Sequence, residues 1–309
     1  MKFSAAVAAT LCASALAAPA PAPAPARSVA KNQGLARKSR LSRANQLQQK
    51  RTSSPTFGHA AGHRTGLNHK AATSAITTDH SAATEVSETT DDSVEDWLNG
   101  SWSGVVVQPG AGDIVGVSAT FALPNVKLPT DGAQVKATTH TASAWVGIDG
   151  YSCGTGLWQA GVDGNVDESG AVSWYAWYEW YPAGTIVVDL GDLGVGDKIF
   201  VNVTASSTTH GSVYMENLAA GKSFSKDVTS TDELCLADAE WIQEDLVADS
   251  TAEGQADFGT ITFANATAYT KTGTLPPTSD TNLMDIKDSN NRQLTSTTYT
   301  KDAVIIKYL

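Results

Sequence analysis

Short stretches in which apolar and polar residues alternate begin near residue 95 and continue to the C-terminus. Within one of them, apolar Val201 and Val203 flank polar Asn202, which is the two-residue period of a strand. No long amphipathic helix occurs in the sequence, so the pattern predicts an all-β, antiparallel sandwich or barrel. Segments rich in Val, Ile, Thr, Trp and Tyr, separated by turn residues, predict strands centred on 102–107, 114–122, 137–148, 172–181, 184–190, 198–205, 212–218, 237–245, 258–269 and 297–308.

The segment 174–181 is unusual because aromatic residues would occupy both faces of the predicted strand. Alternation places Trp177, Glu179 and Tyr181 on one face, and Trp174 and Trp180 on the other. A carboxylate among aromatic rings would be costly in a sealed core without partners. We therefore expect one face of this strand to line a ligand groove.

The N-terminal third has a different composition. Met1 and Lys2 precede an apolar, alanine-rich run, and Ala15-Leu16-Ala17 is a small-x-small cleavage site, so residues 1–17 are predicted to be a signal peptide. Residues 18–95 begin with an alternating Pro-Ala stretch, which is an extended spacer. We predict that 18–95 is a pro-segment and that 96–309 is the folded, secreted domain.

Charge divides the chain in the same way. The first 78 residues hold 11 of the 21 basic residues and none of the 32 acidic ones, which leaves residues 79–309 with a formal charge of −22. The secretion signal and the scarcity of aromatic residues argue against a nucleic-acid-binding arm. We expect a basic pro-segment that inhibits an acidic domain and loosens as carboxylates are protonated in acid. No later segment reaches the roughly 20 apolar residues of a membrane span.

The cysteine count also fits an exported protein. Cys12 leaves with the signal peptide, so Cys153 and Cys235 remain and are predicted to form one disulfide. Asn-x-Ser/Thr triplets at Asn99, Asn202 and Asn265 predict a glycoprotein.

Several common hydrolase motifs are missing. The sequence has no Asp-Thr-Gly or Asp-Ser-Gly pair and no His-Glu-x-x-His, which disfavours pepsin-like and zinc peptidase sites. The segment 150–154 matches Gly-x-Ser-x-Gly, but a strand-like run at 157–162 follows it where a nucleophile elbow needs a helix. Carboxyl and amide side chains therefore remain as the candidate catalytic groups, and no metal site is predicted.

Three blocks of sequence resemble the glutamic peptidases, the eqolisin family. The first comprises Ala144-Trp145-Val146-Gly147-Ile148-Asp149-Gly150 and Leu157-Trp158-Gln159-Ala160-Gly161-Val162-Asp163, with Cys153 between them. The second is Trp177-Tyr178-Glu179-Trp180-Tyr181-Pro182. The third is Cys235-Leu236-Ala237-Asp238-Ala239-Glu240-Trp241-Ile242-Gln243-Glu244-Asp245. The order of the blocks makes the resemblance specific.

This resemblance implies a two-sheet, lectin-like β-sandwich whose concave face holds the active groove. It implies a secreted, monomeric acid endopeptidase that acts on proteins and peptides without a metal or organic cofactor. Gln159 and Glu240 would be catalytic. Supporting positions around the groove would be Trp102, Trp145, Asp149, Asp163, Trp177, Glu179 and Tyr181.

Glutamine and glutamate can together hydrolyse a peptide bond. A carboxyl group can take a proton from water and return it to the leaving amine. A side-chain amide offers two N–H donors at every pH and can hold a developing oxyanion. Two other functions fit a similar sandwich: a glycoside hydrolase using Glu179 and Glu240 as its carboxyl pair, and a carbohydrate-binding module. Neither explains the basic pro-segment.

Overall fold

The computed structural model describes residues 96–99, 101–130, 139–246, 253–279, 281–288 and 291–309. The expected signal peptide and pro-segment lie outside these residues. The described residues form strands, turns and loops, and none of their segments is a helix able to span a bilayer.

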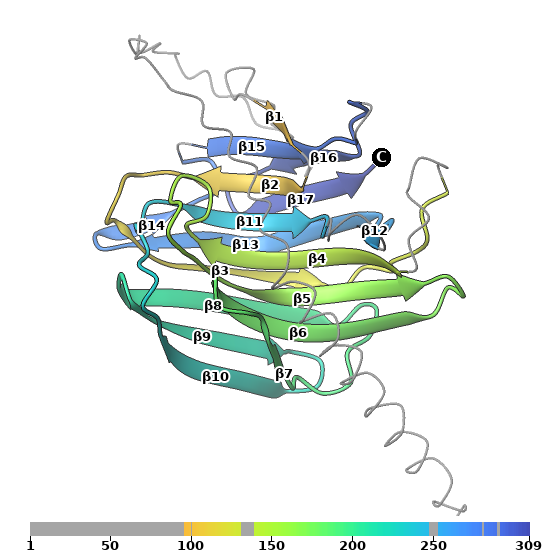
Figure 1. The fold of residues 1–309 in the computed structure, drawn as a ribbon, viewed down its shortest axis with the longest axis horizontal. Helices are drawn as coiled ribbons and strands as arrows, with labels where there is room; N and C mark the ends of the chain where they lie inside the picture. The colour runs from red at the N-terminus through yellow and green to blue at the C-terminus, as the bar shows by residue number, and fades with distance from the viewer. Residues whose placement is uncertain (1–95, 100, 131–138, 247–252, 280, 289–290) are drawn as a thin grey trace, which may run out of the picture. The chain divides into compact units, whose positions relative to one another are not determined.

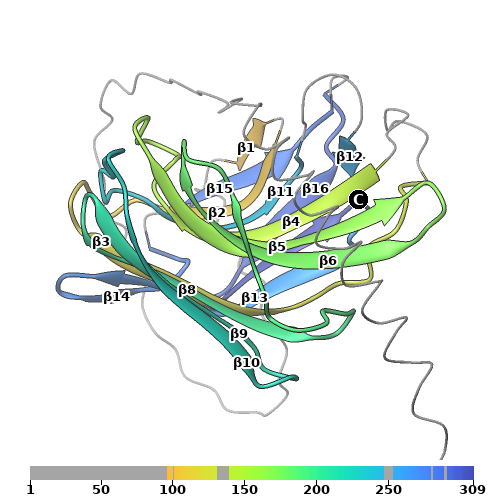
Figure 2. The same cartoon turned by 60° about the horizontal axis from the view of Figure 1, so that its bottom comes forward.

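Two sheets lie one above the other, so the predicted sandwich is confirmed (Figures 1 and 2). The first sheet has nine strands in the order β1-β15-β2-β11-β4-β5-β6-β7, with β12 beside β4. Its pairs are antiparallel except β1–β15 and β12–β4. Its strands are β1 (Asp96–Asn99), β2 (Trp102–Val107), β4 (Thr139–Ile148), β5 (Leu157–Asp167), β6 (Val172–Tyr181), β7 (Ile186–Val188), β11 (Ala239–Glu244), β12 (Glu253–Gln255) and β15 (Thr281–Ile286).

The second sheet has eight strands in the order β10-β9-β8-β3-β13-β17-β16, with β14 beside β13. In Figure 2, β4, β5 and β6 bow so that their concave side faces away from this second sheet. Its strands are β3 (Ile114–Ala122), β8 (Lys198–Ser207), β9 (His210–Asn217), β10 (Lys222–Thr229), β13 (Thr260–Thr270), β14 (Gly273–Leu275), β16 (Thr295–Tyr299) and β17 (Ala303–Tyr308).

The main core fills the space between the sheets. Strand β8 contributes Ile199, Val201 and Val203, which are fully buried, as its alternation predicts. Buried tryptophans of the first sheet also bind the second sheet: Trp158 Nε1 donates to the Thr204 carbonyl at 3.1 Å, and Trp241 Nε1 donates to that of Ser118 at 3.0 Å. Their rings are buried without leaving the indole N–H unpaired.

A second apolar cluster lies on the concave face of the first sheet. It consists of Trp102, Val106, Trp145, Leu157, Trp177, Ile242 and Met284. These residues alternate with core residues along their strands, so β4, β5 and β11 are buried on both faces. The aromatic residues of 174–181 divide in the predicted way, with Trp177 in this cluster and Trp174 and Trp180 in the main core.

Strand prediction was wrong in some places. The run 297–308 is two strands, β16 and β17, joined by a turn. Strands β1, β10, β12, β14 and β15 were not predicted. Strand β10 lies at a sheet edge, and five of its eight residues are exposed, so the sequence gives little apolar signal there.

Candidate active site

Strand register places the two candidate catalytic residues on one line across the first sheet. Glu240 of β11 pairs with Gly147 of β4, Gly147 pairs with Gln159 of β5, and Gln159 pairs with Glu179 of β6. We call these four residues the central row. Directly paired residues of neighbouring strands point to the same face. Glu240 and Gln159 therefore stand on the concave face, with only a glycine between them.

Gly147 keeps the space between the two side chains open. A Cβ atom at this position would lie 2.7 Å from Glu240 Oε1, closer than such atoms come in proteins. Gly147 is not among the residues with positive φ, so its backbone does not require glycine. The requirement is for room beside Glu240. No function was predicted for Gly147, since a glycine in a strand carries no chemical signal.

Gln159 is held in one orientation. Its Nε2 donates to Glu179 Oε2 at 2.7 Å, and Glu179 Oε1 accepts from Thr185 Oγ1 at 2.9 Å. The carbonyl oxygen of Gln159 is buried and finds no hydrogen-bond partner among the described residues. Glu179 is thus the orienting partner of the amide. A second N–H of Gln159 and its carbonyl oxygen are left for other groups.

Glu240 is fully buried, and neither of its carboxyl oxygens has a hydrogen-bond partner within the described part of the chain. Burial raises the pKa of this carboxyl well above its usual range, and the charges of Asp238 and Asp149 raise it further. Its usual value of about 4.3 does not hold in this setting. Once ionised, a carboxylate of raised pKa is a stronger base.

Asp149 organises the loop that leads into β11. Its Oδ2 accepts from the backbone N–H groups of Cys235 and Leu236, at 2.7 and 2.8 Å. Its Oδ1 accepts from those of Ala237 and Asp238, at 2.7 and 3.2 Å. Burial nevertheless raises the pKa of Asp149. The side chain is directed into this loop and not across the concave face, so it fixes the start of the strand that carries Glu240.

The loops beside Asp149 are also joined covalently. Cys153 and Cys235 form the predicted disulfide, which links the β4–β5 loop to the loop before β11. Asp238 adds a second link by accepting from Ser152 N at 2.7 Å and from Gln108 Nε2 at 2.7 Å. The hydroxyl of Ser152 also donates to Asp238, which gives it a structural partner and no histidine base.

Asp163 fixes the aromatic residues on one side of the concave face. Its carboxylate accepts from Trp177 Nε1 at 2.7 Å, from Ser143 Oγ at 2.6 Å and from the Tyr175 hydroxyl. It is therefore an anchor for two rings. Sequence reasoning did not single out Tyr175, although its place two residues before Trp177 puts it on the same face.

The other side of this face is built around Trp145. Its Nε1 donates to Glu244 Oε2 at 2.9 Å, and its ring packs edge-on against Trp102, with centroids 5.0 Å apart. Glu244 was not predicted as a site residue, and the structure gives it an orienting contact with this tryptophan. Tyr181 packs against the apolar cluster at the end of β6. The predicted aromatic residues thus meet around the central row.

The row also tests the glycoside hydrolase alternative. Three strand spacings of about 4.8 Å put the backbones of Glu179 and Glu240 roughly 14 Å apart. Paired carboxyls in glycoside hydrolases are about 5–9.5 Å apart. Gln159 lies between the two glutamates and engages Glu179. This intervening amide, and not the backbone spacing, disfavours a glycosidase pair.

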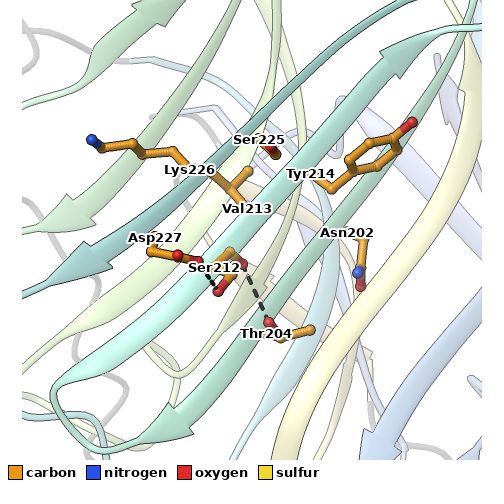
Figure 3. Close-up of a pocket in the computed structure, with 8 residues that line it drawn as sticks. All are labelled: Asn202, Thr204, Ser212, Val213, Tyr214, Ser225, Lys226 and Asp227. Carbon is orange, nitrogen blue, oxygen red and sulfur yellow. Dashed lines mark hydrogen bonds between the residues drawn. The ribbon is translucent and has the colours of Figure 1, made fainter.

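A separate pocket of about 380 Å³ lies on the outer face of the second sheet (Figure 3). Its lining comes from β8, β9 and β10 and contains none of the predicted site residues. Ser212 Oγ donates to Asp227 Oδ1 at 2.7 Å, so the pocket's carboxylate already has a partner. Asn202 of a predicted sequon borders it, and glycosylation there stays a prediction. Nowhere in the described ranges do three His, Cys, Asp or Glu side chains gather as a metal ion would require.

The raised pKa of Glu240 predicts how stability changes with pH. The folded state binds this proton more tightly than the unfolded state, so this carboxyl disfavours folding at neutral pH. That penalty disappears as pH falls through the raised folded pKa to the unfolded value of about 4.3. In a Gln159→Ala background, which limits self-digestion, Glu240→Gln should therefore increase the free energy of unfolding at pH 7, and the gain should shrink in acid. Denaturation curves at several pH values measure it. A gain independent of pH would contradict the assignment.

Comparison with known proteins shows that the chain is similar to peptidases in sequence and fold. The sequence profile of the Peptidase A4 family matches residues 100–308. Aspergillopepsin-2 of Aspergillus niger is 34% identical over 226 residues, which are 68% of this chain and 77% of that protein. Scytalidopepsin B of Scytalidium lignicola is 30% identical over 223 residues, which are 69% of this chain and 79% of that protein.

Solved structures of glutamic peptidases are similar to this chain as well. A crystal structure of scytalido-glutamic peptidase with a transition state analog inhibitor has a TM-score of 0.58 and 27% identity, covering 69% of this chain and all of that one (100%). Aspergilloglutamic peptidase from Aspergillus niger has a TM-score of 0.51 and 39% identity, covering 55% of this chain and 99% of that one.

Proposed function

The chain belongs to the Peptidase A4 family and is a glutamic-type endopeptidase, and we propose that it hydrolyses peptide bonds through Gln159 and Glu240. One observation carries this proposal. The two side chains flank Gly147 on the concave face, and the buried oxygens of both have no hydrogen-bond partner among the described residues. These oxygens can accept hydrogen bonds from a water molecule that attacks the scissile peptide group.

Glu240 is the general base and then the general acid. Its carboxylate takes a proton from the water, whose oxygen attacks the scissile carbonyl carbon. The protonated carboxyl then gives that proton to the amine nitrogen as the C–N bond breaks. Proton, nucleophile and leaving group balance without a covalent enzyme intermediate. The raised pKa of Glu240 makes its carboxylate a stronger base toward the water proton. Only molecules in which Glu240 is ionised can take this proton, so activity depends on the ionised fraction.

Gln159 stabilises the charge that develops on the carbonyl oxygen. One N–H of its amide is engaged by Glu179, which fixes the plane of the group. The second N–H can donate to the oxyanion, while the carbonyl oxygen accepts from the attacking water. A donor positioned in advance stabilises the transition state without having to reorganise during the reaction.

The N-terminal segments complete the proposal. Residues 1–17 direct secretion, and residues 18–95 are an intramolecular inhibitor that is removed in acid to release a monomeric enzyme. The charge asymmetry supports this, because the first 78 residues carry no acidic group and the remainder is strongly acidic. Protonation of the acidic partner weakens the attraction.

The function is tested with purified full-length protein at pH 3–4. We expect it to lose its N-terminal segment, as seen by intact mass, and to cleave a denatured protein while leaving a panel of polysaccharides intact. Cleavage of the sugars alone would overturn the peptidase assignment. Retention of the N-terminal segment through prolonged acid incubation would overturn self-activation only.

A further inference from the structure

A second polar row crosses the concave face away from the central row. Gln255 of β12 pairs with Thr141 of β4, and Thr141 pairs with Asn165 of β5. The adjoining residues Ala256 and Val166 belong to the main core, so Gln255 and Asn165 point to the opposite, concave side. We call Gln255, Thr141 and Asn165 the distal row.

Most amide atoms of the distal row have no hydrogen-bond partner among the described residues. Thr141 Oγ1 donates to Asn165 Oδ1 at 2.8 Å. Asn165 Nδ2, Gln255 Nε2 and Gln255 Oε1 are buried with no hydrogen-bond partner among the described residues. Gln255 is 0% exposed and Asn165 is 2% exposed. An unpaired buried polar group destabilises the folded state, and native proteins rarely leave several such groups close together.

The chemistry of these atoms identifies what would satisfy them. Two unpaired amide NH2 groups and one unpaired carbonyl acceptor lie along the row, and none of its side chains is charged. An extended peptide presents carbonyl acceptors and N–H donors in alternation, and a side-chain amide can pair with both. Trapped water is the competing occupant, since buried water commonly satisfies such groups.

The distal row and the central row lie on the same concave face of the first sheet. Thr141 and Gly147 are six residues apart on β4, which is about 20 Å at roughly 3.3 Å per residue. An extended peptide of about six residues spans this distance. Trp145 and Ser143 occupy the intervening positions on the same face, so a long substrate could reach both rows.

We propose that Gln255 and Asn165 form a distal subsite that hydrogen-bonds the backbone of a polypeptide substrate about six residues from the scissile bond. The proposal rests on the proposed function. It makes the enzyme selective for long, unfolded chains over short peptides, without regard to side-chain sequence at the distal position.

The test compares short and long fluorogenic peptides with the same cleavable core, extended by about six residues at either end. Acid-treated wild-type chain, Gln255→Met and Gln243→Met are assayed. Methionine keeps the length of glutamine and removes its amide. Gln243 is the matched control because its Oε1 is also buried and unpartnered within the described residues, but it pairs with Ala144 on the core side of the sheet.

Extension at one end should raise the wild-type kcat/KM about tenfold, the factor that corresponds to roughly 1.4 kcal/mol. The ratio of kcat/KM for the extended peptide to kcat/KM for the short peptide should fall to about one in Gln255→Met and stay near the wild-type value in Gln243→Met. N-methylation of the distal peptide amides should abolish the wild-type gain without altering the protein, which keeps the test valid if a variant fails to fold. The subsite is overturned if the wild-type enzyme shows no effect of peptide length, or if Gln255→Met shows the full effect. Either result would mean that buried water satisfies the amides of the distal row. Cleavage of the short core would still support the proposed function.

Discussion

Glu240→Gln should lower kcat by about 10²–10⁴-fold, the usual contribution of general acid–base catalysis. Glutamine matches glutamate in shape, so the change removes the titrating group and leaves the concave face filled. Burial raises the pKa of Glu240 and thus favours the neutral form of this side chain, as does a neutral glutamine in its place. The measurement is kcat on a fluorogenic peptide at acidic pH.

An inactive variant cannot remove its own N-terminal segment, so each precursor is first processed by wild-type enzyme fixed to a resin. Intact mass then confirms that wild type and variant have the same N-terminus. Glu244→Gln is the matched control, because Glu244 shares the face of Glu240 and contacts Trp145. It should retain far more activity than Glu240→Gln. Equal losses in the two variants would mean that Glu240 has no special role.

Gly147→Ala should lower kcat by about 10²-fold or more, because displacement of reacting groups by about 1 Å can cost that much. The added Cβ would lie 2.7 Å from Glu240 Oε1 and 2.8 Å from Trp145 Cζ3, so both side chains must shift. The extended backbone itself accepts alanine. We therefore expect the variant to fold and to bind peptide, with a larger change in kcat than in KM.

Gly116→Ala is the matched control for that substitution. Gly116 lies on β3 of the second sheet, and its added Cβ would meet Thr204 Cγ2 and Tyr269 Cδ2, both at 3.2 Å. Any cost should appear in the melting temperature and not in kcat. Gly147→Ala with wild-type kcat would show that the space between Glu240 and Gln159 is not used in catalysis.

Much of the fold could be predicted because burial follows alternation in its central strands. Strand β8 buries every second residue, which is the pattern visible in its sequence. Strand β15, TNLMDI, has no such regularity, because it lies beside an edge strand and buries residues of both faces at one end. Register between strands also could not be read from the sequence, since it depends on which strands become neighbours.

The sequence predicts site residues whose side chains are themselves reactive or polar. It predicts less well the residues whose role depends on how the strands pair. Gln159 and Glu240 came from resemblance between ordered blocks, and their common row required the pairing of β11, β4 and β5. Asp149 was predicted from its resemblance to a groove carboxylate, whereas its contacts with the backbone N–H groups before β11 could be found only in the structure. Gly147 and Gln255 were missed because a glycine and an isolated glutamine have no distinctive sequence signal.

The dyad itself is tested most directly by a double-mutant cycle on kcat with Gln159→Ala, Glu240→Gln and the combined variant, all processed in the same way. Gln159→Ala should cost about 10²–10³-fold. Groups that act on one transition state lose their effects together, so the double variant should be much less impaired than the product of the two single losses. Wild-type turnover in either single variant would contradict the account.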